Sequence, residues 1–416
     1  MLGGRLWRHP DFLKLWAGDT VSQFGSQVTL LAVPTVAILV LHAGPFQVGL
    51  LSALEFLAFP TLGLVAGVYA DRLPRRPIMI VCDLGRMLAL GTIPVAFLVN
   101  ALTLEQLYVV ALLTGIFTVF FDVSYQSYLP VLVDRSNLLE GNTKLEISRS
   151  AAQVSGPAVA GFLIQWLGGA KAVAFDALSF LVSAIALSAI RTPEPEPRPA
   201  TASGATGFVA EMKEGIMVVF KNPILWRIAG CTATTNFGSI MVFGAVLLVF
   251  VYRDLHLSAA VVGVIFAIGS VGGLLGALMA SWISRRFGLG LTLGVTIVVG
   301  GLCLLLTPLA LLGAPIIVLS ATGLVSGLTI PVYNINQVSL RQAITPDRVQ
   351  GRMNATMRTI VWGTFPLGGL LGGILGTTVG VVQTIILGGL ISTLAALWIF
   401  VGPVIRVKEQ PEPVMA

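Results

Sequence analysis

Three acidic side chains, Asp19, Glu55 and Asp122, lie inside apolar runs that are long enough to cross a lipid bilayer. A charged side chain at the middle of a membrane costs about 2.5–3.5 kcal/mol on insertion scales, so such a residue usually faces a cavity or a partner. Glu55 stands about nine residues, or ~13 Å at the helical rise, into its run. We expect these acids to bind protons; a structural hydrogen bond is the alternative for Glu55.

Uncharged polar side chains accompany these acids. Residues four apart share one face of a helix, so each set can act together, either as a binding surface or as hydrogen bonds between helices. The candidate sets are Asp19, Gln23 and Gln27; Asp122 and Gln126 with Tyr125 beside them; Thr235 and Asn236; and Tyr333, Asn334, Asn336 and Gln337.

Other reactive residue types form no recognisable site. The sequence has no Gly-x4-Gly-Lys-Ser/Thr phosphate loop, which argues against ATP-driven transport by this chain alone. The cysteines have neither metal-binding nor disulfide spacing. We therefore expect no enzymatic activity, cofactor or metal. The dispersed residues are His9, His42, His256, Cys82, Cys231 and Cys303.

Composition indicates a membrane protein. Of 416 residues, 56% are hydrophobic and 11% charged, whereas soluble domains carry roughly a quarter charged residues. A membrane-spanning helix needs about 20 mostly apolar residues. The sequence predicts twelve spans, at 12–41, 46–70, 78–99, 104–130, 144–167, 170–190, 224–251, 258–284, 289–312, 314–339, 352–377 and 379–404.

The basic residues predict the orientation of these spans. With the N-terminus inside, the outer loops hold only Lys171 and Arg253, and the other 25 − 2 = 23 basic residues lie on the inner side. Cytoplasmic loops are enriched in Lys and Arg. We therefore expect a multi-pass protein of the inner (plasma) membrane with both termini in the cytoplasm. The net charge of +6 reflects this topology and not nucleic-acid binding.

The chain divides into two similar halves, predicted at 1–190 and 224–416. Between them, 191–207 is rich in Pro, Glu, Ser and Gly, which predicts a mobile linker, and 208–223 has the pattern of an amphipathic helix on the cytoplasmic face. Short matches recur about 210 residues apart: Phe24-Gly25-Ser26 with Phe237-Gly238-Ser239, and Arg75-Arg76 with Arg285-Arg286. Paired six-span halves are a transporter architecture; chance similarity of Gly-rich helices is the alternative.

The loop after the second span carries a glycine, then Asp-Arg after three residues, then Arg-Arg after two more. These residues are Gly67, Asp71, Arg72, Arg75 and Arg76. It resembles the signature loop of the major facilitator superfamily, with a proline at 74 in place of the usual glycine. Gly67 would permit close helix contact, and Asp71 would meet a helix N-terminus. The arginines could pair with Asp134 or Asp83. A loop whose basic residues only set topology is the alternative.

A second segment, with Gly156, Pro157 and Gly161, looks like the Gly-Pro motif of drug/proton antiporters, with Ala160 at a usual glycine. Stretches around 16–34, 175–184 and 350–373 are similar to the bacterial branch of macrolide-efflux and enterobactin-exporter proteins. The resemblance implies an all-α membrane protein with twelve transmembrane helices in two pseudo-symmetric bundles. It also implies that the first, fourth, seventh and tenth spans, and their polar residues, line a central cavity.

These observations predict a secondary transporter that exports an amphipathic drug, natural product or siderophore by alternating access, in exchange for protons. Its partners would be this substrate and the lipid bilayer, and we expect a monomer. No fixed cationic cluster lies at mid-membrane to indicate anionic sugar phosphates. Transport of a lysophospholipid, or a non-transporting scaffold or sensor, are the alternatives. We also expect Arg149 to lie in a charge cluster with Glu146, and Asp176 to pack or to pair with Lys171.

Overall fold

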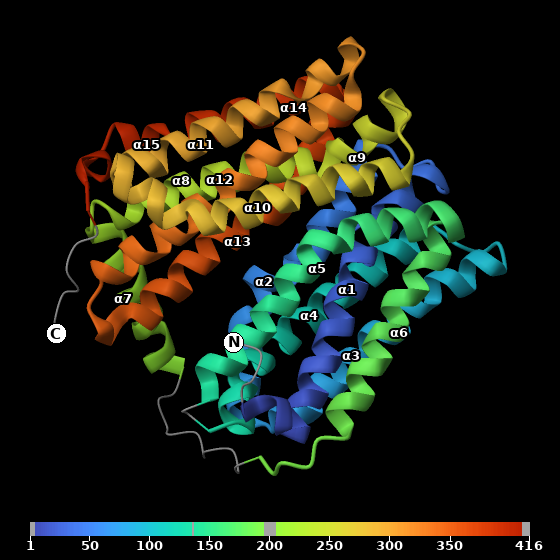
Figure 1. The fold of residues 1–416 in the computed structure, drawn as a ribbon, viewed down its shortest axis with the longest axis horizontal. Helices are drawn as coiled ribbons and strands as arrows, with labels where there is room; N and C mark the ends of the chain where they lie inside the picture. The colour runs from blue at the N-terminus through green and yellow to red at the C-terminus, as the bar shows by residue number, and fades with distance from the viewer. Residues whose placement is uncertain (1–4, 135–136, 195–204, 410–416) are drawn as a thin grey trace. The chain divides into compact units, whose positions relative to one another are not determined.

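The computed structural model describes residues 5–134, 137–194 and 205–409, and the regular elements in these ranges are helices. In lipid each apolar segment must satisfy its own backbone hydrogen bonds, which a helix does. The α-helices are α1 Pro10–Leu39, α2 Pro45–Arg72, α3 Arg75–Leu98, α4 Leu104–Leu132, α5 Leu138–Leu167, α6 Gly169–Ser188, α7 Ala205–Lys221, α8 Leu225–Met241, α9 Leu247–Val249, α10 Ala259–Phe287, α11 Leu289–Leu306, α12 Pro315–Ala343, α13 Asp347–Thr378, α14 Val381–Leu394 and α15 Leu397–Phe400 (Figure 1).

Eleven helical segments of the described residues are long and apolar enough to cross a membrane. One of them, Leu225–Asp254, runs from α8 through the π-helical turn Val242–Val246 into α9 and ends with a second π-helical turn, Phe250–Asp254. The predicted fifth span, 144–167, coincides with α5, which is not among the eleven. The first half of α5 contains four charged residues and the second half contains two glutamines, so its mean hydropathy is lower than that of its neighbours.

Local side chains and glycines set several helix ends. The His9 ring accepts a hydrogen bond from the Phe12 backbone N–H at 3.1 Å and caps α1. Thr103 caps α4 in the same way through the Gln106 N–H at 3.3 Å. Gly168, with φ +85°, separates α5 from α6, in a left-handed conformation that glycine adopts without a steric penalty.

The chain divides into two compact units. Unit 1 comprises Met1–Ala43, Leu54–Ala200 and Ser258–Ala267; unit 2 comprises Gly44–Ala53, Thr201–Leu257 and Ile268–Ala416. The first turns of α2 therefore belong to unit 2, and the first turns of α10 to unit 1. The sequence-based boundaries at 1–190, 191–223 and 224–416 remain a prediction.

In unit 1, α1 packs against α5 and α6, and α3 packs against α4 and α6 (Figure 1). Gly25 makes the α1–α6 contact possible, because a methyl group there would overlap the side chains of Ser179 and Asp176. Small residues at such crossings let helix backbones approach closely in membranes. This contact fixes α1 and α6, which carry several of the polar residues considered below.

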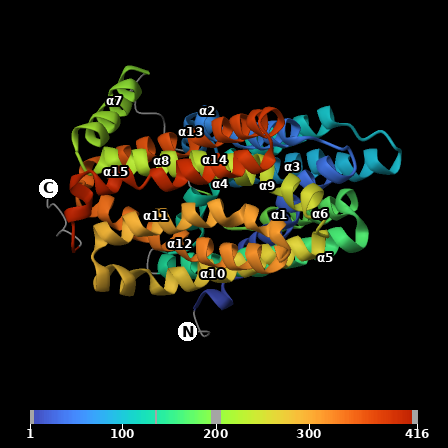
Figure 2. The ribbon, with the colours of Figure 1, turned by 90° about the horizontal axis from the view of Figure 1, so that it is seen from above.

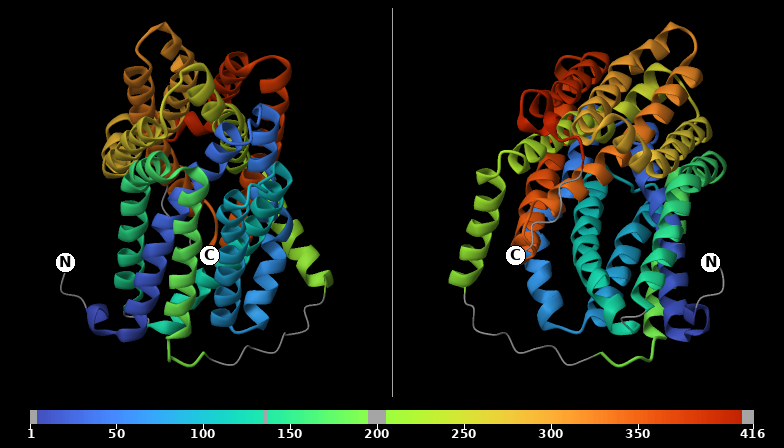
Figure 3. Two further views of the ribbon diagram at one scale, coloured as in Figure 1. Left: turned by 90° about the vertical axis from the view of Figure 1, so that its right-hand side faces the viewer. Right: turned by 60° about the vertical axis from the view of Figure 1, so that its left-hand side comes forward.

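In unit 2, α8 packs against α13 and α14, and α11 packs against α12 and α14 (Figure 2). The short helix α7 lies along α13 (Figure 3). Gly215 of α7 faces the Arg352 backbone, and the Arg352 guanidinium forms an ion pair with Glu214. The helix predicted at 208–223 is thus present as Ala205–Lys221, while residues 195–204 of the predicted mobile linker lie outside the described residues.

Candidate functional site

A cluster of polar side chains joins α1, α4 and α5 in unit 1. Asp19 is 4% exposed and accepts a hydrogen bond from the Gln23 amide at 3.3 Å. The Tyr125 hydroxyl also donates to this carboxylate, and the charges of Asp122 and Arg149 act on it. The cluster thus combines two carboxylates with one guanidinium and one phenol. Such a group can hold a proton or bind a polar group of a ligand.

The Gly-Pro segment of α5 lies beside this cluster. A Cβ on Gly156 would come within 2.5 Å of Gln27 Cγ, so only glycine leaves room for that glutamine. Pro157 stands inside α5, and Gly161 packs against Gly263 in the first turns of α10, within unit 1. The motif residues therefore serve close packing of α5 on both sides, and one of them positions a predicted site residue.

Glu55 lies on α2, where it is half-buried. Its backbone carbonyl is the nearest atom to the Cβ position of Gly115, so α2 and α4 touch at this level. Ala58 and Val119 continue the contact with apolar side chains. The helix contact next to Glu55 is therefore made by backbone and apolar side chains.

Unit 2 holds a second polar group, on α8 and α12. Tyr333, 5% exposed, shares a hydrogen bond of 2.8 Å with the Thr232 hydroxyl. One turn further along α12, Gln337 is buried, and its side-chain oxygen has no hydrogen-bond partner among the described residues. Asn336 donates to the Val332 carbonyl at 2.7 Å within its own helix. Tyr333 and Gln337 are the predicted residues that this group brings together.

Three predicted residues stand outside these groups. Gln126 and Asn334 are exposed on α4 and α12, and Asn236 is half-buried on α8. An amide on an exposed helix face can still line an aqueous cavity, but the structure gives these three no shared contact. Their role in a substrate site stays a prediction.

The sequence reasoning missed a buried ion pair on α3. Arg86 contacts the Asp83 carboxylate at 2.5 Å, and the two residues are 5% and 0% exposed. The guanidinium also lies over the rings of Phe121 and Phe180, at 4.3 and 4.1 Å from their centroids. The i, i+3 spacing of an acid and a base within an apolar run could have indicated this pair.

These contacts correct the expectation for Asp83 and decide between the two alternatives for Asp176. Asp83 pairs with Arg86 of its own helix and not with the loop arginines, because it lies two turns inside α3 and away from the loop. Asp176 contacts the hydroxyls of Ser179 and Thr29. Lys171 is exposed, which leaves packing as the outcome for Asp176.

The signature loop is organised by a residue from the linker. Both carboxylate oxygens of Glu194 accept hydrogen bonds, from the backbone N–H groups of Arg75 and Arg76, at 2.7 Å each. The Arg76 side chain in turn donates to the Leu187 and Ser188 carbonyls at the end of α6. An anion at a helix N-terminus and a cation at a C-terminus are both favourable. These contacts join the start of α3 to the end of α6.

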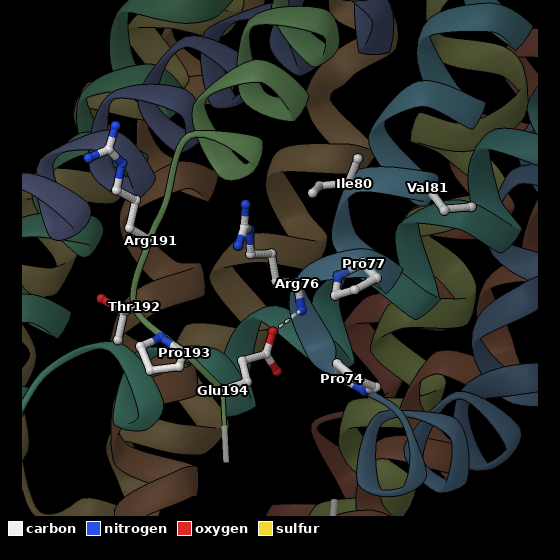
Figure 4. Close-up of a pocket in the computed structure, with 9 residues that line it drawn as sticks. All are labelled: Pro74, Arg76, Pro77, Ile80, Val81, Arg191, Thr192, Pro193 and Glu194. Carbon is white, nitrogen blue, oxygen red and sulfur yellow. Dashed lines mark hydrogen bonds between the residues drawn. The ribbon is translucent and has the colours of Figure 1, made fainter. Parts of the chain in front are cut away.

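These residues line a pocket of about 490 Å³, formed by Pro74, Arg76, Pro77, Ile80, Val81 and residues 191–194 (Figure 4). The Glu194 carboxylate points to the α3 backbone across it. The side chains of Asp71 and Arg72 lie outside what the structure describes. No described atom lies within 4 Å of a Cβ placed on Gly67, so the close helix contact expected there is not found among the described residues.

Asp11 fixes the preceding residues of the linker. Its carboxylate accepts hydrogen bonds from the Arg191 and Thr192 backbone N–H groups at 3.0 and 2.9 Å, and from the Thr192 hydroxyl at 2.7 Å. Its other oxygen pairs with Lys14 at 2.7 Å. The segment 191–194 is therefore held at both ends, by α1 and by α3.

Comparison with known proteins identifies the family. Residues 6–413 match the family model described as transmembrane secretion effector (MFS_3). The multidrug efflux pump Tap of Mycolicibacterium fortuitum is 27% identical over 390 residues, 91% of each chain. Macrolide efflux protein A of Streptococcus pyogenes is 24% identical over 385 residues, 91% of this chain and 92% of that protein.

The fold has a solved counterpart. The bacterial homologue of the iron transporter ferroportin, in its inward-facing state, superposes with a TM-score of 0.74 at 18% identity and covers 95% of this chain and 99% of that one. This likeness shows the major facilitator fold. The protein is therefore a multi-pass membrane transporter with efflux relatives, and not an enzyme. The match across nearly the whole chain shows that it belongs to the transmembrane secretion effector family of major facilitator transporters.

Proposed function

We propose that this transporter exports an amphipathic small molecule, such as a drug, natural product or siderophore, in exchange for protons. The observation that carries the proposal is the buried Asp19 carboxylate, which interacts with Gln23, Tyr125, Asp122 and Arg149 from three helices. The efflux relatives support the direction of transport.

The proposed exchange needs acids that bind protons within the membrane. The charges of Asp122 and Arg149 both act on Asp19, so protonation of one of the two acids relieves the repulsion between like charges. Glu55 stands within the apolar run of α2, next to an apolar contact with α4, where a charged form is poorly solvated. Each of these acids is a candidate to release a proton inward while substrate moves outward.

We propose that both termini face the cytoplasm, because 23 of the 25 basic residues then lie on the inner side. Transport would proceed by alternating access of two six-helix halves, divided as 1–190 and 224–416, in a monomer. The Glu194 contacts to Arg75 and Arg76 would join α3 to α6, so that the first half moves as one body.

Glu55→Gln should reduce proton-driven export at least tenfold, because glutamine keeps the shape and polarity of the side chain but cannot bind or release a proton. The measurement is accumulation in inside-out vesicles of two amphipathic probes, ethidium and a radiolabelled macrolide, after a proton gradient is imposed. Expression and thermal stability should stay at the level of the unmodified protein.

Glu105→Gln is the matched control, since Glu105 is an exposed acid in the first turn of α4. It should export both probes at the normal rate. Full activity of Glu55→Gln would remove Glu55 from the mechanism. If the unmodified protein accumulates neither probe, the proposed substrate class is wrong.

A further inference from the structure

Another acid of unit 1, Asp176, is buried beside the ion pair of α3. Asp176 on α6 is 1% exposed, and its carboxylate lies against Thr29 of α1 and Ser179 of its own helix. Gly25 of α1 packs closely on the same carboxylate. A Cβ placed on Gly25 would lie 2.5 Å from Asp176 Oδ1. The charges of Arg86 and Asp83 act on it from α3.

The charges of this cluster do not balance when every acid is ionised. Two buried carboxylates, those of Asp83 and Asp176, face one buried guanidinium. Arg86 is committed to Asp83 by the direct 2.5 Å contact, and two aromatic rings cover its faces. An uncompensated buried charge is costly, and a carboxylate in this position binds a proton instead.

Ser179 is placed to accept a hydrogen bond from a protonated Asp176. The Ser179 oxygen lies 2.8 Å from the Asp176 backbone carbonyl and 3.0 Å from its side-chain oxygen Oδ1. A hydroxyl carries a single hydrogen. When Ser179 donates it to the carbonyl, the contact with Oδ1 needs a hydrogen from the carboxyl group. A neutral Asp176 supplies that hydrogen.

The other described groups around the cluster leave the balance at two buried carboxylates and one buried guanidinium. From α3 the titratable neighbours are Cys82, Asp83 and Arg86, and α6 adds the neutral Ser183 beside Asp83. Among the described residues, the contacts from α1 and α4 are those of the neutral Thr29 and Phe121. The Arg86 Nε atom is buried and has no hydrogen-bond partner among the described residues, so the guanidinium keeps one donor unused inside the cluster.

We propose that Asp176 is a proton-binding site of this transporter, in which the carboxyl group donates to Ser179 when protonated and turns to the Arg86 guanidinium when ionised. The site lies between α1, α3 and α6 of one unit. A shift of α1 at Gly25 would open it to exchange. The role of Asp176 in coupling rests on the proposed proton exchange. The protonation of Asp176 is independent of that exchange.

Infrared difference spectroscopy of the full chain in proteoliposomes tests the protonation directly. A pH step should produce a protonated-carboxyl C=O band that Asp176→Asn removes and that Asp19→Asn and Glu55→Gln retain. Asparagine has the shape of the neutral acid, so this variant should fold. Ser179→Ala is a second variant, which should shift the frequency of the band by removing its hydrogen-bond partner. Identical spectra for the unmodified protein and Asp176→Asn would overturn the proposal.

Proton movement driven by ethidium, read by a pH-sensitive dye inside the same vesicles, tests the role in coupling. Asp176→Asn should lower it at least tenfold while ethidium still equilibrates down its gradient. Normal proton movement in this variant would overturn the role in coupling. If the unmodified protein moves no protons with ethidium, the proposed exchange fails, and the infrared band still decides whether Asp176 binds a proton.

Discussion

Replacing Arg86 with methionine should lower the free energy of unfolding by about 3–5 kcal/mol, the cost of removing one partner of a buried ion pair. Methionine fills much of the same volume between Phe121 and Phe180. It leaves the Asp83 carboxylate, which is 0% exposed, without its cation. A thiol-reactive dye can follow thermal unfolding, because the three cysteines are buried in the folded protein.

The double variant Asp83→Asn with Arg86→Met separates the charge from the packing. It removes both ions, and neutral replacement of a buried pair is often tolerated. We therefore expect it to recover most of the stability that Arg86→Met loses. Lys171→Met is the surface control, with an expected change within about 0.5 kcal/mol. A double variant no more stable than Arg86→Met would contradict the ion-pair explanation.

The length of the apolar runs predicted the helices well, because each such run must form its own backbone hydrogen bonds in lipid. The turn at Gly168 and the amphipathic helix before Lys221 could be read from local chemistry. The fifth span was the hardest case, since α5 begins with charged residues and has polar residues throughout. Its helical state follows from the sequence, but its depth in the membrane does not.

The candidate site was predictable within single helices and not between them. Spacing of four residues placed Asp19 and Gln23 on one face, and the structure joins them by a hydrogen bond. The meeting of Asp19 with Tyr125 depends on how α1 packs on α4, which no local pattern specifies. Asp176 was expected to pack or to pair with Lys171, and its contacts with α1 and α3 were not foreseen for the same reason.

The linker shows the limit of reasoning from composition. Its proline-rich sequence predicted a mobile segment, yet residues 191–194 bind the start of α3 and the first turn of α1 through side chain to backbone hydrogen bonds. Glu194 was counted only as part of a polar, charged stretch. A carboxylate placed a few residues after a helix end is also a candidate cap for a neighbouring helix, and this second interpretation is the one the structure supports.

The contact between α10 and α12 depends on glycines that touch backbone. A Cβ on Gly276 would overlap the Leu328 carbonyl, and a Cβ on Gly272 would overlap the Leu324 carbonyl. Gly327 meets the Gly269 carbonyl from the opposite helix. The four-residue spacing of Gly272 and Gly276 places both on one face of α10, as in the small-residue motifs that pair membrane helices.

Gly276→Val should therefore destabilise the protein by about 2–3 kcal/mol, because the carbonyl it meets cannot move without displacing α12. Gly273→Ala is the matched control on the same helix, since its Cβ would lie 3.8 Å from the nearest atom, the Gly327 carbonyl oxygen. That change should be neutral or stabilising by about 0.5–1 kcal/mol, because alanine favours a helix over glycine. The thiol-dye assay compares the two midpoints in one detergent. If Gly276→Val unfolds at the same temperature as Gly273→Ala, then α10 and α12 do not pack through their backbones at this seam.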